Sequence, residues 1–226
     1  MSIPVIVFLV IIAPALSICL ALLGLETLGS NLMGWILLLV GIAYPAGAVI
    51  YYIIRREPFW QHSRAQVLRE EKGDRSFWGI LPGFLLVFFA PPVEWLYLPA
   101  LLPRLPWLQV AGLILILAGL ALRLWARSHI RGLYTGHVEV SSDSRLVKTG
   151  PYHIIRHPGY LGFLLMTLGI ALGYSSWIGM SGILVFLLPG LAYRIKVEES
   201  LLGTQFGEEY RSYTLETKKR LVPGIW

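Results

Sequence analysis

The class of fold is decided by a stretch without Asp, Glu, Lys or Arg, HPGYLGFLLMTLGIALGYSSWIGMSGILVFLLPGLAY, which runs from His157 to Tyr193. It is long enough for two membrane helices, since one crossing of a bilayer needs about 20 apolar residues. The segment GYSSW at residues 173–177 predicts a turn that divides it. The resulting helices, at about 160–173 and 177–195, are short for full spans, so a tilted or partly re-entrant hairpin stays open.

Four further stretches without charged residues lie upstream and predict one helix each, at about residues 4–25, 32–54, 78–98 and 107–126. The whole chain is 56% apolar and 14% charged, with a mean hydropathy of +0.66. This composition excludes a disordered polymer, and a single cysteine excludes a disulfide scaffold. We therefore expect an all-α polytopic transmembrane helix bundle of about six spans. The start, MSIP, has no basic region, so the first helix is interpreted as a retained span and not as a signal peptide.

The positive charges predict the orientation of these spans. Of the 19 Lys and Arg residues, all except Arg104 fall within residues 55–75, 123–156 and 194–220. Because Lys and Arg collect on the cytoplasmic side of membrane proteins, both termini and the loops 55–77 and 127–160 are expected in the cytosol. The basic charge thus indicates topology and not nucleic-acid binding. Glu94 lies near the outer end of the third helix, where we expect its side chain to reach the interface.

Four of the five histidines lie in the loop before the fifth helix. His153 and His157 are spaced as metal ligands on a helix can be, but Pro158 biases His157 away from helical geometry, and no metal site is predicted. The dipeptides Gly150-Pro151 and Pro158-Gly159 predict turns that stiffen this segment at the membrane face. The residues alone support two interpretations equally: a binding loop, or a basic and aromatic anchor at the membrane interface.

A second cluster follows the last apolar stretch. Arg194 stands one helical turn before Glu198, and Glu199 is adjacent, so the two carboxylates repel each other unless a cation lies close by. The cluster is either a surface ion pair of little energy or an acid and a base at the mouth of the bundle. Helical spacing places the following apolar and aromatic residues on one stripe: Leu202, Phe206, Tyr210 and Tyr213.

Together these segments resemble the isoprenylcysteine carboxyl methyltransferase and phospholipid methyltransferase superfamily of integral membrane enzymes. The resemblance rests on three elements in order, within residues 123–226. They are Leu-Val-x-x-Gly-x-Tyr at 146–152, Arg-His-Pro-x-Tyr-x-Gly at 156–162, and the Glu-Glu pair followed by Phe-Gly, Tyr-x-x-Tyr and a closing LVPGIW. It implies a methyltransferase core at residues 107–226, containing the loop 127–160 and the C-terminal helix, and a scaffold at residues 1–106.

The resemblance implies S-adenosylmethionine (SAM) as methyl donor, bound from the cytosol, and a lipidic or prenylated acceptor that enters from the bilayer. The cofactor-binding residues that it implies are His137, Ser144, Arg145, Leu146, Val147, Tyr152, His157, Pro158, Gly159, Tyr160, Glu198 and Glu199. His137 stands where the carboxyl methyltransferases often have an amide, and Gly159 occupies a variable position. Arg194, and after it Arg156, is expected to orient the acceptor, because a guanidinium binds a carboxylate through two hydrogen bonds.

The expected activity is methyl transfer to a carboxylate of the isoprenylcysteine type. The alternatives are N-methylation of a phospholipid, S-methylation of a small thiol, an NADPH-dependent sterol-type reductase and a non-enzymatic membrane protein. The location implied is the cell membrane of a prokaryote or the endoplasmic reticulum of a eukaryote, with the active site on the cytosolic side. The acceptor and the oligomeric state are left open by the sequence.

Overall fold

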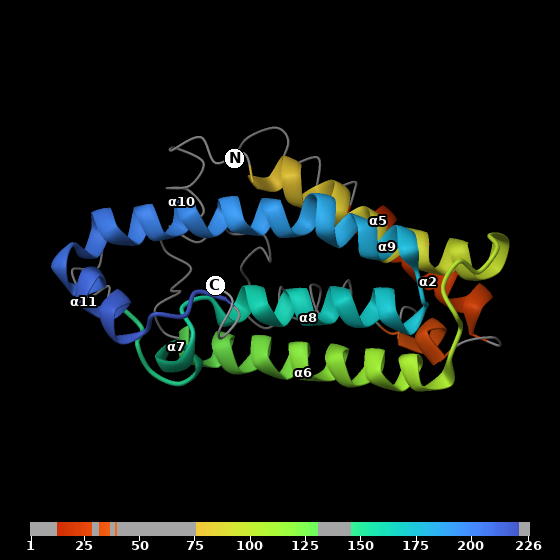
Figure 1. The fold of residues 1–226 in the computed structure, drawn as a ribbon, viewed down its shortest axis with the longest axis horizontal. Helices are drawn as coiled ribbons and strands as arrows, with labels where there is room; N and C mark the ends of the chain where they lie inside the picture. Colours follow the sequence, from red (N-terminus) through yellow and green to blue (C-terminus); the bar gives the residue numbers. More distant parts are fainter. Residues whose placement is uncertain (1–12, 29–31, 37–38, 40–75, 131–145, 222–226) are drawn as a thin grey trace. The chain divides into compact units, whose positions relative to one another are not determined.

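The computed structural model describes residues 13–28, 32–36, 39, 76–130 and 146–221. The helices are α2 (Ala13–Thr27), α5 (Ser76–Tyr97), α6 (Pro106–Ile130), α7 (Pro151–Ile154), α8 (Pro158–Gly173), α9 (Trp177–Gly182), the π-helix η2 (Ile183–Leu187), α10 (Leu188–Phe206) and α11 (Glu208–Glu216) (Figure 1). Helices α9, η2 and α10 follow one another without a break. The all-α prediction is confirmed, since the described residues contain helices, turns and irregular segments but no strand.

Three helical segments are long and apolar enough to cross a membrane: Trp78–Tyr97, Pro106–Ile130 and Trp177–Phe206. They match the predicted third, fourth and sixth helices. Helix α8 is apolar but has 16 residues, which gives a length of about 24 Å, shorter than a bilayer core of about 30 Å. Most of the predicted helix at 32–54 and of the loop at 55–77 lies outside the described residues, as does the start of the first helix.

The predicted sixth span, at about 177–195, is part of a longer helix, as the helical spacing of Arg194 and Glu198 predicts. The helix continues through the charged residues Arg194–Glu199 and ends at Phe206. A helix need not stop where the sequence turns polar, because its hydrogen bonds are internal. It ends instead at Gly207, whose φ of 51° glycine adopts without steric cost. This break also corrects the single stripe predicted from Leu202 to Tyr213, since Tyr210 and Tyr213 belong to the separate helix α11.

The described residues form two compact units. Unit 1 contains α2 with residues 32–36, 85–113 and 170–180, and unit 2 contains residues 76–84, 114–130, 146–169 and 181–221. The core of unit 1 includes Tyr174, which is 2% exposed and whose hydroxyl lies 3.2 Å from that of Thr27. The edge of the Tyr174 ring meets Trp95, with the ring centroids 6.0 Å apart.

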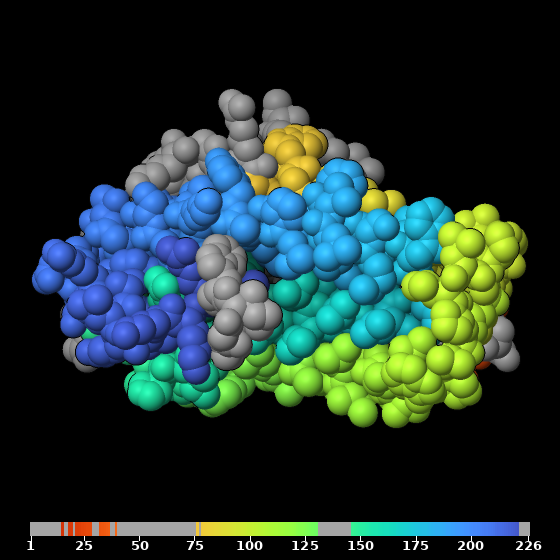
Figure 2. Space-filling view, in the orientation of Figure 1, coloured from red at the N-terminus to blue at the C-terminus, as the bar shows by residue number. Residues whose placement is uncertain are grey.

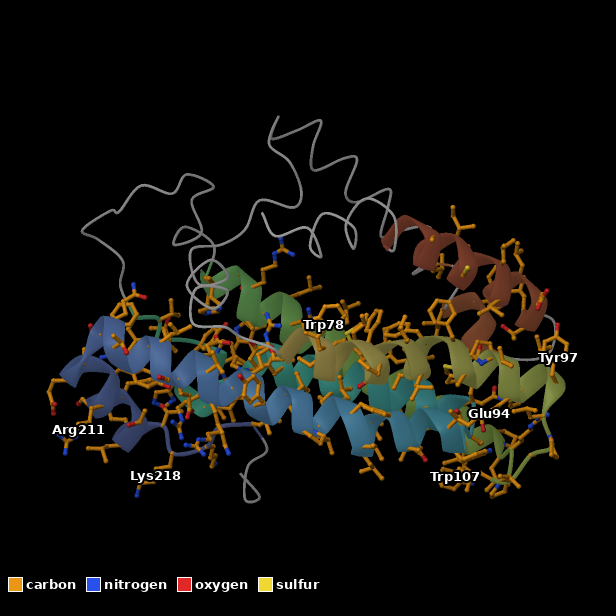
Figure 3. All side chains as sticks on the ribbon, turned by 90° about the horizontal axis from the view of Figure 1, so that it is seen from above. Trp78, Glu94, Tyr97, Trp107, Arg211 and Lys218 are labelled. Atoms are coloured by element: carbon orange, nitrogen blue, oxygen red, sulfur yellow. The ribbon has the colours of Figure 1, made fainter. Side chains whose placement is uncertain are left out.

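In unit 1, the Glu94 side chain is 6% exposed, so it is buried within the protein and does not extend outward as predicted. Its carboxylate accepts hydrogen bonds from the Ser176 hydroxyl and, at 3.2 Å, from the backbone N–H of Ile178. The Ser176 hydroxyl in turn accepts from the N–H of Gly179 at 2.8 Å. The first N–H groups of a helix lack internal partners and favour an anion. Glu94 is therefore held inside by the start of α9; Figure 3 shows it on α5, toward the same end as Tyr97.

Within unit 2, glycines allow helices to approach closely. Helices α6 and α8 lie side by side (Figure 1), and a Cβ added to Gly162 would come within 2.6 Å of the Gly119 carbonyl oxygen and the Arg123 side chain. Gly83 of α5 faces η2, where a Cβ would come within 2.8 Å of the Leu187 nitrogen. Small residues at such crossings let membrane helices pack backbone against backbone.

Candidate active site

The loop before α8 is shaped by Gly150 and by two prolines that each start a helix. Gly150 has a φ of 61°, and its Cα faces the His129 ring so closely that an added Cβ would lie 2.3 Å from Nε2. Pro151 starts the four-residue helix α7, and Pro158 starts α8. His157 lies between them and is not helical, as the proline after it predicts. The turn at Gly150 is confirmed, whereas the turn predicted at Pro158-Gly159 is wrong because these residues form the start of α8. The Arg156 and His157 side chains between the two prolines reach α10.

Glu199 of α10 contacts two arginines and one histidine from two other segments. Its Oε1 atom lies 2.8 Å from Arg156 Nη1 and 3.4 Å from His157 Nε2, and its Oε2 atom lies 3.1 Å from Arg220 Nε. The expectation that a cation stands close to the Glu198-Glu199 pair is therefore confirmed. A carboxylate with this many partners at partial burial is stabilised by their charges and joins the segments that supply them.

Glu198 has a different set of neighbours from Glu199. The Tyr160 hydroxyl donates a hydrogen bond to Glu198 Oε2, and the same hydroxyl accepts one from Arg194 Nε at 3.1 Å. The His157 ring stacks on the Tyr160 ring with centroids 5.7 Å apart and an interplanar angle of 24°. Arg194 and Glu198 therefore meet through Tyr160, and a direct ion pair between them is not among the salt bridges of the described residues.

A segment of the C-terminal tail, Thr217–Leu221, lies against the loop before α8. The backbone N–H groups of Arg156 and His157 donate to the carbonyls of Lys219 and Arg220, at 2.9 and 3.0 Å. Leu221 is 3% exposed, and its burial anchors the end of this tail segment. In Figure 2 atoms of the loop (green-teal) lie among the dark blue atoms of α11 and the tail. The sequence analysis treated Lys218-Lys219-Arg220 as a topology signal, so it missed Arg220 as a partner of Glu199.

Two buried tyrosines of α11, Tyr210 and Tyr213, lie near the loop before α8. The Tyr213 hydroxyl donates to the Tyr152 carbonyl oxygen at 2.7 Å. Tyr210 and Tyr213 are 6% and 3% exposed, and burial raises the pKa of each hydroxyl to about 12, with the charge of Glu199 adding to the effect for Tyr210. Both hydroxyls therefore keep their protons at physiological pH.

The structure brings together six of the residues implied by the resemblance: Arg156, His157, Tyr160, Arg194, Glu198 and Glu199. Tyr152 joins them through α11, and the Gly159 carbonyl accepts from Arg123 Nη1 at 3.2 Å, a partner that the sequence analysis missed. Leu146 and Val147 are half-buried and precede Gly150, with no recorded polar contact to this cluster. His137, Ser144 and Arg145 lie outside the described residues.

The cluster around Tyr160 contains the Glu198 carboxylate, the Arg194 guanidinium and the stacked rings of His157 and Tyr160. Glu198 suits an ammonium group, and Arg194 suits a carboxylate or a phosphate. The Cζ atom of Arg194 lies over the Tyr160 ring, 5.9 Å from its centroid. The face of this ring can therefore lie next to a positive group. The site can thus bind a molecule or a pair of molecules that carries charges of both signs.

Comparison with known proteins finds methyltransferases. The family model described as phospholipid methyltransferase matches residues 107–209. Protein-S-isoprenylcysteine O-methyltransferase of Saccharomyces cerevisiae is 34% identical over 119 residues, which are 51% of this chain and 48% of the yeast protein. The human enzyme of the same name is 33% identical over 129 residues, 55% of this chain and 43% of the human protein. The matched region thus spans about half the length of these curated relatives.

A solved structure of a eukaryotic intramembrane Ras methyltransferase, isoprenylcysteine carboxyl methyltransferase, matches the fold. The match has a TM-score of 0.54 at 22% identity and covers 91% of this chain and 73% of that chain. At this identity it shows a common fold, a polytopic membrane helix bundle. Over residues 107–209, which include the cluster around Glu198, this chain is therefore similar in sequence to phospholipid methyltransferases and to isoprenylcysteine carboxyl methyltransferases.

Proposed function

We propose that the protein transfers a methyl group from SAM to the carboxylate of a lipidic acceptor, of the S-prenylated cysteine type, inside a membrane. The observation that carries this proposal is the pair Glu198 and Arg194, one helical turn apart and joined by the Tyr160 hydroxyl. It is supported by the identity of about a third to protein-S-isoprenylcysteine O-methyltransferases across the same segment.

The residues of the cluster fit the methyl donor. SAM supplies a methyl group on a positive sulfonium, beside an ammonium and a carboxylate. Glu198 would hold the ammonium, and the Tyr160 face would lie near the sulfonium, a cation-π contact of about 0.5–2 kcal/mol. Because Glu199 already contacts two guanidinium groups and the His157 ring, we assign it to holding the loop in place. The proposed donor site also includes His137, residues 144–147, Tyr152 and residues 157–159.

Arg194 orients the acceptor in this proposal. A carboxylate is ionised at neutral pH, so it attacks without a general base, and its negative charge is lost as the new C–O bond forms and the S–C bond breaks. No proton has to move. The task left to the protein is alignment, which can supply several kcal/mol of a displacement barrier. A planar guanidinium fixes both carboxylate oxygens, and Arg156 is engaged by Glu199, which leaves Arg194 as the first choice.

The orientation in the membrane is part of the proposal. The Lys and Arg distribution supports cytosolic placement of both termini and of the loop 127–160, so SAM would enter from the cytosol and the acceptor from the bilayer. The membrane would be the cell membrane in a prokaryote and the endoplasmic reticulum in a eukaryote. Residues 107–226 would form the methyltransferase core, which agrees with the matched range 107–209, and residues 1–106 the scaffold.

The test is a methylation assay with the purified full chain in lipid discs. Labelled SAM is offered with S-farnesylcysteine, phosphatidylethanolamine, a fatty acid and a small thiol in parallel. We expect a base-labile methyl ester on the farnesylcysteine. Methylation of the phospholipid amine instead would favour the second candidate, which the description of the family model supports. Transfer to none of the acceptors would overturn the proposed function.

Arg194→Lys tests the acceptor role. Lysine keeps the charge but loses the planar fork, so it is not conservative where a carboxylate is bound through two hydrogen bonds. Turnover should fall at least about tenfold, equivalent to about 1.4 kcal/mol in the barrier, while SAM affinity changes little. The matched control is Lys196→Arg, an exposed cation on the same helix. Normal turnover in Arg194→Lys would remove Arg194 from the site.

A further inference from the structure

Two arginines lie on one exposed face of α6, close to its end at Ile130. Arg123 and Arg127 are one helical turn apart, and both side chains are exposed. They fall within Pro106–Ile130, a segment long and apolar enough to cross a membrane. Arg123 lies about 10 Å along the helix axis from Ile130. At this depth a spanning helix passes from hydrocarbon to headgroups, and a charged side chain there indicates a functional site by default.

Helix α8 holds the Arg123 side chain in a fixed position. Arg123 Nη1 donates to the Gly159 carbonyl at 3.2 Å, and Cζ lies over the Phe163 ring, 5.4 Å from its centroid. The Cγ atom lies across Gly162, where an added Cβ would come within 2.6 Å of it. The salt bridges among the described residues include neither Arg123 nor Arg127. The Arg123 guanidinium is therefore positioned in advance, and no carboxylate of the described residues forms an ion pair with it.

The surroundings of the two arginines indicate which kind of anion fits. Exposed leucines continue their face along α6 at a spacing of three and four residues: Leu117, Leu120 and Leu124. A soluble phosphate gains nothing from this apolar stripe, whereas an acyl chain can lie along it. Exposed Trp125 adds an aromatic ring, which favours the headgroup level. Basic residues beside membrane helices bind anionic lipid headgroups, because a planar guanidinium matches the oxygens of a phosphate.

We propose that Arg123 and Arg127 together bind the phosphate of an anionic phospholipid, whose acyl chain lies along Leu120 and Leu124. The bound lipid lies in the leaflet at this end of α6, which is the cytosolic leaflet in the proposed orientation. It is a resident lipid and not the methyl acceptor, so the inference goes beyond the proposed function and does not depend on it. A zwitterionic phospholipid fits less well, because the two guanidinium groups repel its ammonium group.

Native mass spectrometry of the full chain measures this preference without methyl transfer. The protein is equilibrated in detergent with equal amounts of phosphatidylglycerol and phosphatidylcholine of the same chain length, and the two lipid-bound forms are compared. The wild type should retain more phosphatidylglycerol. A cation near a membrane surface strengthens the binding of an anionic lipid about fivefold. Arg127→Gln and Arg123→Gln should therefore each lower the ratio of bound phosphatidylglycerol to phosphatidylcholine about fivefold, and the double variant about 25-fold.

Three controls separate this site from general surface charge and from a loss of structure. Lys196→Gln removes an exposed cation of α10 in the same unit and should leave the ratio unchanged. Among the described residues it is Arg123 that donates to α8, so Arg127→Gln tests the site even where Arg123→Gln does not fold. Glycerol phosphate has the phosphate but no acyl chain, and it should not displace the lipid at equal concentration.

Four results would overturn the inference. They are a wild-type ratio of one, an unchanged ratio in Arg127→Gln, an equal fall in Lys196→Gln, and displacement of the lipid by glycerol phosphate. Neither a methyl donor nor a methyl acceptor is present in this experiment. Each of these results therefore leaves the proposed function to be decided by the methylation assay.

Discussion

At the scale of single residues, the adjacent side chains of Glu198 and Glu199 have different surroundings. Glu199 contacts Arg156, His157 and Arg220, while Glu198 contacts the Tyr160 hydroxyl. Their side chains point to different neighbours because successive residues on a helix are about 100° apart around its axis. The Glu199 carboxylate therefore holds segments together, and in the proposed function the Glu198 carboxylate binds the ammonium of the methyl donor.

Glu198→Gln tests this division of roles. The amide keeps the size of the side chain and can accept from Tyr160, but it loses the charge that an ammonium requires. Loss of one partner from a charge-assisted contact costs about 1.5–3 kcal/mol, so affinity for S-adenosylhomocysteine should fall about ten- to hundredfold. Calorimetry measures it, and Glu208→Gln, at an exposed position of α11, is the control. Equal affinities in the two variants would contradict a role of Glu198 in binding the ammonium group.

Tyr210 predicts a dependence of stability on pH. Its pKa is raised from 10 to about 12 by burial and by the charge of Glu199, so the folded protein keeps a proton that the unfolded chain releases above pH 10. The contribution is complete below pH 10 and is lost as the pH rises toward 12. Between pH 9 and pH 11 the wild type should therefore lose about 1 kcal/mol more stability than Tyr210→Phe. Thermal melting across this range measures it, and parallel curves for the two proteins would contradict the prediction.

At the scale of elements, the contact between α6 and α8 depends on the absence of a side chain. A Cβ on Gly162 would come within 2.6 Å of the Gly119 carbonyl, whereas a Cβ on Gly159, one turn earlier in α8, would meet nothing within 4 Å. Gly162→Leu should destabilise the fold by about 1–3 kcal/mol through overpacking. Gly159→Ala is the matched control and should leave stability unchanged or higher, since alanine is the better helix former. Melting temperatures in lipid discs compare the two, and the reverse order would refute this crossing.

At the scale of the whole molecule, the charge distribution predicts which ends of the helices share a side of the membrane. Two exposed positions test it in a Cys19→Ser background: Ala100, in the segment between α5 and α6, and Ser212, in α11. An impermeant maleimide added outside intact cells should label Ala100→Cys at once and Ser212→Cys after permeabilisation, because Lys and Arg mark the cytosolic side. Labelling of both variants from outside would contradict the orientation, and with it the entry of SAM from the cytosol.

Part of this protein follows from its sequence without tertiary structure. Apolar runs and turn dipeptides are local signals, so they predict the spans at 78–98 and 107–126, the turn at 173–177 and the non-helical His157. The motifs at 146–162 and 194–199 indicate the superfamily, because residue types at fixed spacing survive where overall identity is low. The resemblance implies that His157, Glu198 and Glu199 share one site, and in the structure His157 and Arg156 contact Glu199.

The tertiary structure alone decided the partners that lie far apart along the chain. Arg220 reaches Glu199, the tail carbonyls accept from the backbone of Arg156 and His157, and Glu94 is buried against the start of α9. No local feature of the sequence distinguishes Arg220 from Lys218 and Lys219. Its partner depends on where the tail lies in the folded protein. Likewise the hydropathy of residues around Glu94 predicts depth in a membrane but not which helix start faces the carboxylate. Such contacts depend on how helices pack, and packing is set by the whole set of side-chain volumes and not by any one segment.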